Sequence, residues 1–210
     1  MKDNSPYHLH YQEMQESYAK YPFVFAAVEK LTKANTPSII AIEGRCGSGK
    51  SSLAAILAEM FDCNLFHMDD FFLPYEMKTK ERLAKSGGNI YYERFQTEVI
   101  THLQNREAIT YQPYSCVSGT LGQSIHVEPK KVTIIEGVYC LHPTLLQYYD
   151  LKIFLTLNSQ VQKERILRRS GEDMFQKYLS KWIPMEEQYF LTLNIEERCD
   201  IVVDTSDLFI

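Results

Sequence analysis

The glycine-rich segment at residues 44–51 is the part of the sequence whose residue types and spacing most directly indicate chemistry. It reads Gly-Arg-Cys-Gly-Ser-Gly-Lys-Ser and fits the pattern G-x-x-x-x-G-K-[ST], a loop that wraps nucleotide phosphates. Glycine permits the tight turns, and successive N–H groups form an anion nest beside the positive end of the next helix. The residues predicted to contact the nucleotide are Gly44, Arg45, Cys46, Gly47, Ser48, Gly49, Lys50, Ser51 and Ser52.

The end of this loop carries its two most specific side chains. We expect Lys50 to reach the β- and γ-phosphates and the Ser51 hydroxyl to bind Mg²⁺, which predicts ATP and Mg²⁺ as cofactors. A glycine-rich turn that matches by chance is the alternative, and the flanking apolar segments argue against it. The Cys46 thiol lies beside the positive end of a helix, which favours reactivity, although a small tolerated side chain is the simpler interpretation.

Carboxylates end further apolar segments of the chain. Asp69 and Asp70 follow the segment 64–68, and Glu136 closes the segment 131–137. Ligands of open α/β sheets bind at the carboxyl ends of the strands. Phosphoryl transfer to an alcohol needs a proton acceptor and a magnesium site, and these carboxylates can supply both. The alternatives are turn or cap residues for the aspartates and a salt bridge for Glu136.

Basic residues gather on one predicted helix. Arg165, Arg168 and Arg169 are spaced by three and four residues, so they lie near one helical face. Such a cluster can close over a transferring phosphate, which predicts a lid at about residues 161–178. An ordinary solvated basic face is the alternative.

The elements that must position these residues alternate along the chain. Apolar, β-branched runs predict strands over residues 38–43, 64–68, 131–137, 151–155 and 201–203. Helical patterns cover residues 21–33, 52–61, 79–85, 91–103, 161–178 and 186–197. Residues 109–127 alternate around two glycine-containing turns and predict an inserted β-hairpin. The order predicts an α/β fold in three layers, with a parallel five-stranded sheet and helices on both faces.

Composition sets the broad class. A chain of 210 residues fits one α/β domain, and its net charge of -5 argues against a broad nucleic-acid-binding surface. The five cysteines form no C-x-x-C pair, which favours reduced thiols in the cytoplasm over disulfides or zinc. Residues 1–15 are polar and no run reaches the length of a membrane span, so we expect neither a signal peptide nor membrane insertion. The sequence does not determine the oligomeric state, and a homo-oligomer is one of the alternatives.

The motifs together resemble a known family. The phosphate loop is followed in order by His67-Met68-Asp69-Asp70-Phe71-Phe72, Ile134-Ile135-Glu136-Gly137-Val138-Tyr139 and the arginine helix. This order and spacing resemble the uridine kinase and phosphoribulokinase family of P-loop kinases over roughly residues 36–205, and residues 182–190 are similar to the region after its lid. The resemblance implies an N-terminal helical extension at residues 1–35 and a single P-loop kinase domain at residues 36–210.

Roles for individual residues follow from that resemblance. It implies Asp69 as the catalytic base, assisted by Lys50, Arg165 and Arg169. It places Arg168 at the nucleotide, and Ser51, Glu136 and Asp69 at the metal. The hairpin resembles the family's acceptor-binding element, and the residues implied to contact the acceptor are Asp70, Tyr91, Arg94 and Tyr114.

The chain departs from the family's pattern at the residues that bind the acceptor. Uridine kinases usually carry Tyr-Asp-Phe and then His at the hairpin, where this chain has Tyr114-Ser115-Cys116 and Gly119. The family's ribose-binding acid matches Tyr91. A site that loses polar partners changes or relaxes its specificity. The phosphoryl-transfer half of the pattern is therefore intact, whereas the uridine-reading half is altered.

The sequence thus predicts ATP-dependent phosphoryl transfer from the loop to a hydroxyl of a small-molecule acceptor. A uridine kinase-like nucleoside kinase leads, and a kinase for a pantothenate- or sugar-like alcohol is the alternative. A P-loop nucleotide hydrolase or switch ranks lower, because the chain lacks a guanine-reading N-K-x-D motif. A non-catalytic nucleotide-binding module is disfavoured because Lys50, Ser51, Asp69 and Glu136 are all present.

Overall fold

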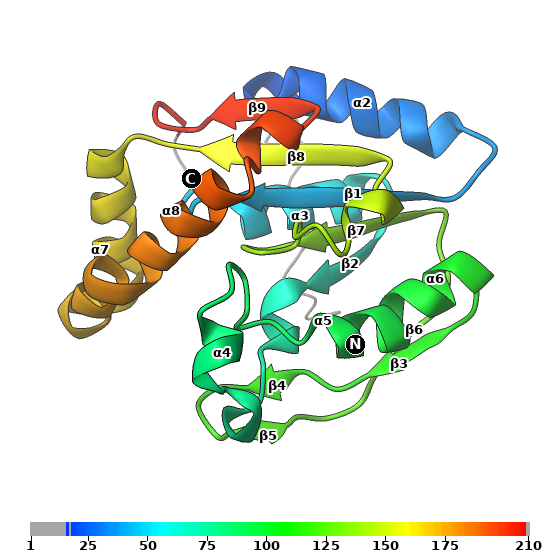
Figure 1. The fold of residues 1–210 in the computed structure, drawn as a ribbon. Coiled ribbons are helices and arrows are strands. Elements are labelled where there is room, and N and C mark those ends of the chain that lie inside the picture. The colour runs from blue at the N-terminus through cyan, green and yellow to red at the C-terminus, as the bar shows by residue number, and fades with distance from the viewer. Residues whose placement is uncertain (1–15, 17, 209–210) are drawn as a thin grey trace, which may run out of the picture.

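A parallel β-sheet forms the centre of the molecule (Figure 1). The computed structural model describes residues 16 and 18–208, so most of the first half of the predicted extension at residues 1–35 lies outside the described residues. Within them, five strands pair in the order β2-β7-β1-β8-β9. Their bounds are Ser38–Gly44 (β1), Asn64–His67 (β2), Val132–Glu136 (β7), Leu151–Thr156 (β8) and Ile201–Asp204 (β9).

The register of the sheet brings the functional strand ends together. Glu136 at the end of β7 pairs with His67 of β2 on one side and with Ile42 of β1 on the other. Gly44, where the phosphate loop begins, pairs with Leu155 of β8. Because all these strands run parallel, their carboxyl ends meet at one edge, where a ligand of an α/β sheet binds.

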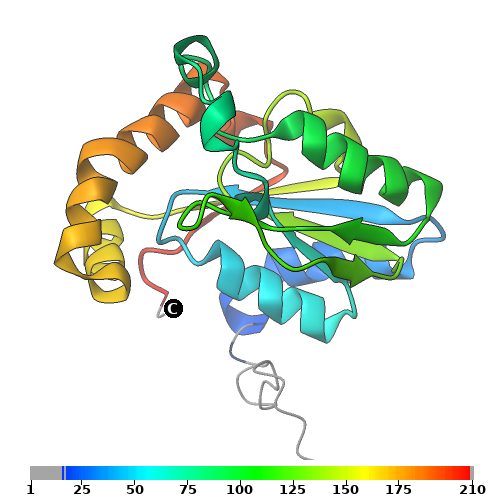
Figure 2. The same cartoon turned by 90° about the horizontal axis from the view of Figure 1, so that it is seen from below.

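Helices cover both faces of the sheet, as predicted (Figure 2). Helices α2 (Pro22–Lys33) and α3 (Lys50–Met60) pack on one face. The other face carries a continuous helix made of α5 (Tyr92–Phe95), a π-helical turn (Gln96–Ile100) and α6 (Thr101–Asn105). β1 and β7 are almost wholly buried, which explains why their sequences read as continuous apolar runs.

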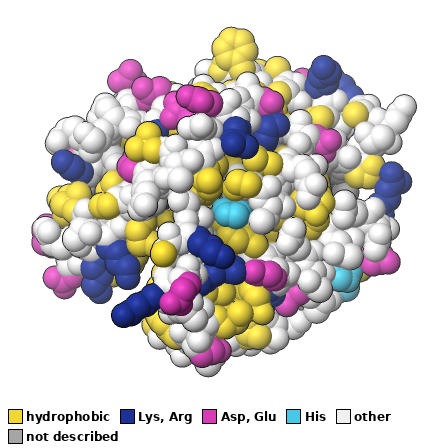
Figure 3. Space-filling view, viewed as in Figure 1, with side chains coloured by type: hydrophobic (Ala, Val, Ile, Leu, Met, Phe, Trp, Pro, Cys, Tyr) yellow, Lys and Arg dark blue, Asp and Glu magenta, His cyan; other side chains and the backbone are white. Residues whose placement is uncertain are grey.

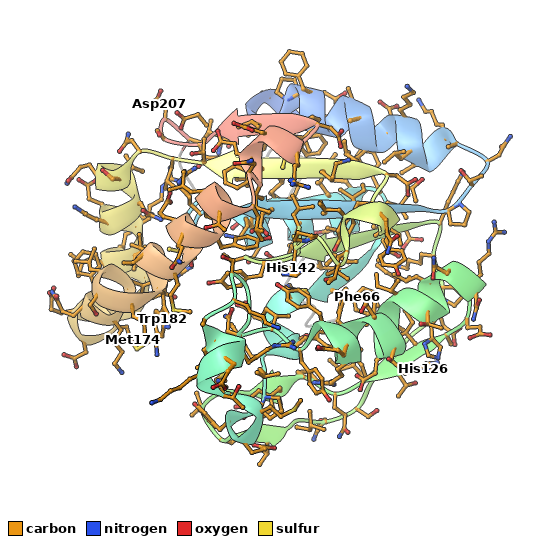
Figure 4. All side chains as sticks on the ribbon, in the orientation of Figure 1. Phe66, His126, His142, Met174, Trp182 and Asp207 are labelled. Carbon is orange, nitrogen blue, oxygen red and sulfur yellow. The ribbon has the colours of Figure 1, made fainter. Side chains whose placement is uncertain are left out.

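The predicted hairpin insertion is present and packs onto the second face. β3 (Ile109–Tyr111) pairs antiparallel with β6 (Ile125–Val127), and β4 (Tyr114–Ser115) pairs with β5 (Thr120–Leu121). Tyr111 anchors the insertion, because its ring lies 5.5 Å from that of Phe66 and 5.4 Å from that of Phe71. Phe66 is labelled in Figure 4, between β2 and the α5–α6 helix.

The segment between β2 and α5 is made of short turns. A 3-10 turn at Met68–Phe71 carries the two predicted aspartates, and a second follows at Tyr75–Met77. The helix predicted at residues 79–85 is the short α4 (Lys80–Leu83). Its first turn is capped by the Thr79 side chain, which accepts a hydrogen bond from the Arg82 N–H.

The segment of residues 159–192, which we call the lid segment, differs in detail from the two predicted helices. α7 (Ser159–Lys177) is broken at Gly171, whose φ of 73° and ψ of 170° are not helical. A π-helical turn (Tyr178–Trp182) then leads into α8 (Ile183–Thr192). The prediction of a helix at residues 186–197 was wrong at both ends, because Pro184 suits the first turn and Asn194 has a left-handed φ of 49°. Gly171 divides the lid segment into a first arm (residues 159–170) and a second arm (residues 172–192).

Gly44 gives a first testable prediction, on stability. Its φ is 143°, and a Cβ there would lie 2.1 Å from the Leu155 carbonyl oxygen on β8. We expect Gly44→Ala to lower the free energy of unfolding by roughly 2–5 kcal/mol, because strain and overlap add. Gly47→Ala is the control, since its φ of 80° brings strain but its nearest neighbour would be 3.4 Å away. Thermal unfolding checks the pair, and equal losses in both variants would contradict the prediction.

Candidate active site

One large cavity lies at the carboxyl edge of the sheet, between the phosphate loop, the turn after β2 and the lid segment. Its volume is about 1210 Å³, which exceeds the usual size of a pocket for one small ligand. The predicted residues that line it are Cys46, Gly47, Gly49, Lys50, Ser51, Ser52, Asp69, Glu136, Arg165, Arg168 and Arg169. In Figure 3, basic side chains (dark blue) lie over the lid segment at the left and over the α4 segment below the centre.

The phosphate loop has the backbone that an anion site requires. Gly49, directly before α3, has a left-handed conformation with a φ of 90°. The first N–H groups of α3 therefore open toward the cavity at the positive end of the helix. Lys50 is 8% exposed, and its Nζ donates to the carbonyl oxygens of Gly44 (2.7 Å) and Arg45 (3.0 Å). The lysine is thus held at the loop, where phosphate charge would need to be balanced.

The structure separates the two neighbouring aspartates. Asp69 lines the cavity, whereas Asp70 accepts a hydrogen bond from the Tyr111 hydroxyl (3.2 Å) and does not line it. Desolvation by the surrounding protein raises the pKa of Asp69, and repulsion from Glu136 raises it further. A carboxylate with a raised pKa that still opens to the cavity is suited to accept a proton near neutral pH.

Oxygen donors for a hard cation meet at the end of β7. The Ser51 hydroxyl donates to Glu136 Oε1 (3.1 Å), and His67 Nδ1 lies 2.6 Å from the same oxygen. Among the described residues, no group of three or more His, Cys, Asp or Glu side chains could hold a metal by itself. The donor set nevertheless fits Mg²⁺, which binds through one or two protein oxygens and takes its other ligands from phosphates and water.

The lid arginines border the cavity in different ways. Arg165 directs its guanidinium to the C-terminal segment, where it donates to the Thr205 carbonyl oxygen (2.7 Å) and that of Leu208. Arg169 lies over the Tyr178 ring, 5.6 Å from its centroid, and donates to the Tyr178 hydroxyl (2.9 Å). Arg169 is therefore positioned by the lid segment itself, while Arg165 also joins the lid segment to the end of the chain.

Three predicted loop residues do not line the cavity: Gly44, Arg45 and Ser48. The Arg45 side chain turns away, and its Nε donates to Glu187 on α8 (2.7 Å) while its Nη1 donates to Thr156 (2.7 Å). It also lies 5.5 Å from the Phe154 ring centroid. Arg45 therefore joins the loop to α8 and β8 with its side chain, and its N–H donates to the Leu155 carbonyl oxygen on β8 (3.1 Å).

The predicted acceptor-contacting residues Asp70, Tyr91, Arg94 and Tyr114 also lie outside the lining. Arg94 Nε donates to Glu98 (2.9 Å), its Nη2 donates to the Gln112 carbonyl, and its guanidinium lies 4.8 Å from the Phe71 ring centroid. Tyr91 precedes α5 and donates its N–H to the Phe71 carbonyl (2.8 Å). Tyr114 is 6% exposed, and its hydroxyl has no hydrogen-bond partner among the described residues.

Other residues, which the sequence prediction did not assign to the site, line the same cavity. They are Phe72, Tyr75, Lys78, Leu83, Asn89, Cys116, Gly137, Val138, Tyr139, Tyr178, Lys181, Trp182, Met185 and Glu186. The buried Asn89 Oδ1 has no hydrogen-bond partner among the described residues, and Asn89 is part of the cavity lining. Asn89 lies two residues before Tyr91, the position predicted to contact the acceptor. The polar amide of Asn89 was therefore a signal in the sequence that could have identified it as a lining residue. Figure 4 labels Trp182 and Met174, both of which belong to the lid segment.

The buried position of Cys46 resolves the two interpretations of its thiol. Burial raises the pKa of Cys46 strongly, and the nearby Glu186 carboxylate raises it further. Burial and Glu186 thus oppose the effect of the helix end on the Cys46 pKa, which favours the interpretation of Cys46 as a small structural side chain. Cys63 and Cys140 are likewise buried.

Glu43, just before the loop, gives a prediction on pH dependence. Its carboxylate is fully buried and accepts hydrogen bonds from the Gly44 N–H (3.0 Å), the Leu141 N–H (3.2 Å) and the Tyr189 hydroxyl (3.2 Å). Burial raises the pKa of Glu43 from 4.5 to about 8. Between these values the folded protein binds more protons than the unfolded chain, so the free energy of unfolding should fall as the pH rises.

Thermal unfolding of the wild type and of Glu43→Gln, between about pH 5 and pH 8, measures this contribution. We expect the variant to be less stable overall, because one carboxamide oxygen cannot accept from all three donors. Its melting temperature should also fall less steeply with pH than that of the wild type. If the melting temperature of Glu43→Gln fell with pH as steeply as that of the wild type, Glu43 would not be the group whose raised pKa causes the pH dependence.

The parallel sheet, together with a glycine-rich phosphate loop and a basic lid segment that line one cavity, defines a P-loop kinase. A family model described as the phosphoribulokinase / uridine kinase family matches residues 39–176, and the chain belongs to that family. The uridine kinase of Bacillus subtilis is 29% identical over 179 residues, covering 73% of this chain and 80% of that one. The uridine kinase of Oceanobacillus iheyensis is 30% identical over 155 residues, covering 66% and 68%.

Solved structures agree with the fold. A possible uridine kinase from Bacillus stearothermophilus aligns with a TM-score of 0.63 and 19% identity, covering 87% of this chain and all of that one. D-glycerate 3-kinase from Cryptococcus neoformans aligns with a TM-score of 0.52 and 14% identity, covering 82% and 87%. The predicted fold class is thus confirmed, and the chain is an ATP-dependent kinase of a small molecule. None of the helices in its described part is long and apolar enough to span a membrane.

Proposed function

We propose that this kinase transfers the γ-phosphoryl group of ATP to a hydroxyl group of a nucleoside. The observation that carries the proposal is that the phosphate loop, Asp69 and the lid arginines open on one cavity of about 1210 Å³, which has room for a nucleotide and an acceptor side by side. The uridine kinase relatives support a nucleoside as the first acceptor class.

In the proposed reaction, Asp69 accepts the proton of the acceptor hydroxyl as its oxygen attacks the γ-phosphorus. The bond from that phosphorus to the bridging oxygen breaks, and ADP leaves. Lys50 and Arg169 stabilise the negative charge on the transferring group, with Arg168 at the nucleotide. Ser51, Glu136 and Asp69 would hold Mg²⁺, which when bound neutralises phosphate charge.

A non-nucleoside alcohol, such as a pantothenate- or sugar-like compound, is the second candidate. It is favoured by the finding that Asp70, Tyr91, Arg94 and Tyr114 lie outside the cavity lining. The cavity is instead lined by Asn89, whose Oδ1 has no hydrogen-bond partner among the described residues, and by Lys78, whose amino group lies 4.3 Å from the Tyr75 ring centroid. Such groups suit a small polar acceptor as well as a base.

Acceptor-stimulated release of ADP distinguishes these candidates. The protein, ATP and Mg²⁺ are incubated with uridine, cytidine, pantothenate or a sugar alcohol, and ADP is measured by a coupled assay. Stimulation by a nucleoside supports the first proposal, and stimulation by pantothenate or a sugar alcohol alone supports the second. ADP release that no acceptor stimulates would contradict both.

A further inference from the structure

The residue Cys46 of the phosphate loop is held by both arms of the lid segment. Its N–H donates to Glu186 Oε2 on the second arm (3.0 Å). Its carbonyl oxygen accepts from Gln162 Nε2 on the first arm (3.0 Å), and the same nitrogen lies 3.4 Å from the Cys46 sulfur. All three residues are buried, with exposures of 8% for Cys46, 5% for Gln162 and 7% for Glu186.

A carboxylate at the buried position 186 carries a free-energy cost of desolvation. Burying a charge disfavours folding unless hydrogen bonds and opposite charges compensate it. Glu186 obtains that compensation from the Cys46 N–H and from the nearby Lys50 ammonium, while Asp69 adds repulsion. An apolar side chain would fill the same space without this cost, so packing alone does not explain Glu186.

The two arms of the lid segment meet at Gly171, whose backbone is not helical and where an added Cβ would meet nothing within 4 Å. Each arm carries groups that line the nucleotide cavity, Arg168 and Arg169 on the first and Trp182 on the second. A movement of either arm would therefore reach the phosphate loop through the hydrogen bonds of Cys46.

We propose that Gln162 and Glu186 are positioning residues that fasten Cys46, and with it the first half of the phosphate loop, to the two arms of the lid segment. Nucleotide binding at the loop and the placement of the lid groups then change together. Neither side chain needs to touch the reacting atoms. The proposal concerns the nucleotide half of the site, so it stands independently of the acceptor class proposed above.

The test is nucleotide binding by the full-length protein, measured with a fluorescent ADP analogue and with the fluorescence of Trp182, the only tryptophan of the chain. The affinity is measured with the fluorescent analogue. The change in Trp182 fluorescence is measured in a separate titration with unlabelled ADP, so that the two signals do not overlap. Glu186→Leu removes the acceptor for the Cys46 N–H and should weaken binding by about 10- to 100-fold. It should also diminish the change in Trp182 fluorescence on ADP binding.

Two further variants separate positioning from general stability. Glu186→Gln keeps an oxygen that can accept the Cys46 N–H, so its affinity should stay within about threefold of the wild type. Glu187→Gln is the matched control on the same helix, because Glu187 pairs with the Arg45 side chain away from the cavity. It should lower the melting temperature and leave both binding readouts near those of the wild type.

Wild-type affinity together with a wild-type Trp182 response in Glu186→Leu would overturn the proposal. Equal losses of affinity in Glu186→Leu and Glu187→Gln would also overturn it, because any loosening of α8 would then suffice. If Glu186→Leu shows no folding transition, Gln162→Leu takes its place and removes the hydrogen bond from the first arm. The same losses are then expected, and wild-type binding would overturn the proposal.

Discussion

Asp69→Asn is expected to lower the turnover of the kinase by about 10²- to 10⁴-fold while leaving nucleotide binding nearly intact. Asn has the shape of Asp and cannot accept the acceptor's proton. Asp69 is the aspartate of the pair that opens to the cavity, and burial together with Glu136 raises its pKa toward the working range of a base. The measurement combines acceptor-stimulated ADP release with the binding of a fluorescent ADP analogue.

Asp70→Asn is the matched control for this prediction. Its amide oxygen can still accept the hydrogen bond from the Tyr111 hydroxyl, so the hairpin should stay anchored and turnover should change little. A larger loss of turnover in Asp70→Asn than in Asp69→Asn would exchange the two roles and contradict the assignment of the base.

Lys50→Met is expected to lower turnover by about 10²- to 10³-fold and also to weaken nucleotide binding, unlike Asp69→Asn. The ammonium group is the buried cation of the phosphate loop, and in the structure it already binds the Gly44 and Arg45 carbonyl oxygens. Its removal leaves phosphate charge without its partner and two carbonyl groups without their donor. Steady-state kinetics and equilibrium binding with a fluorescent ADP analogue measure the two effects.

Lys181→Met serves as the control for charge, because Lys181 is exposed and lines the same cavity from the lid segment. Loss of one exposed cation should have a much smaller effect than loss of Lys50, since water screens its charge. If the two variants lost turnover equally, general electrostatics of the cavity would explain the effect, and a specific phosphate contact of Lys50 would not.

The fold could be predicted from the sequence because its signals are local. The apolar run at residues 38–43 must be a buried strand, and the glycine-lysine loop after it needs a strand before and a helix behind. Glu136 and Asp69 could also be placed at the ligand-binding edge, because parallel strands end on the same side. Helix ends were less accurate, as α8 shows, because Pro184 and Asn194 set them through backbone angles.

The acceptor side could not be predicted in the same way. Whether Asn89 or Tyr91 faces the cavity depends on the turn before α5, and spacing in the sequence does not reveal its direction. Arg45 occupies a variable position of the loop pattern, so the pattern says nothing about where its side chain points. Glu186 belongs to no general phosphate-binding pattern, and only the folding of α8 onto the loop brings it to Cys46.

The most direct test of the account is the fate of the phosphate group. The protein is incubated with Mg²⁺, ATP and the acceptor that stimulates ADP release most, and the products are followed by phosphorus NMR. We predict one phosphate ester of the acceptor for each ADP formed, and formation of that ester about 10²- to 10⁴-fold more slowly by Asp69→Asn. ADP accompanied by inorganic phosphate, with no ester, would identify a hydrolase and contradict the account.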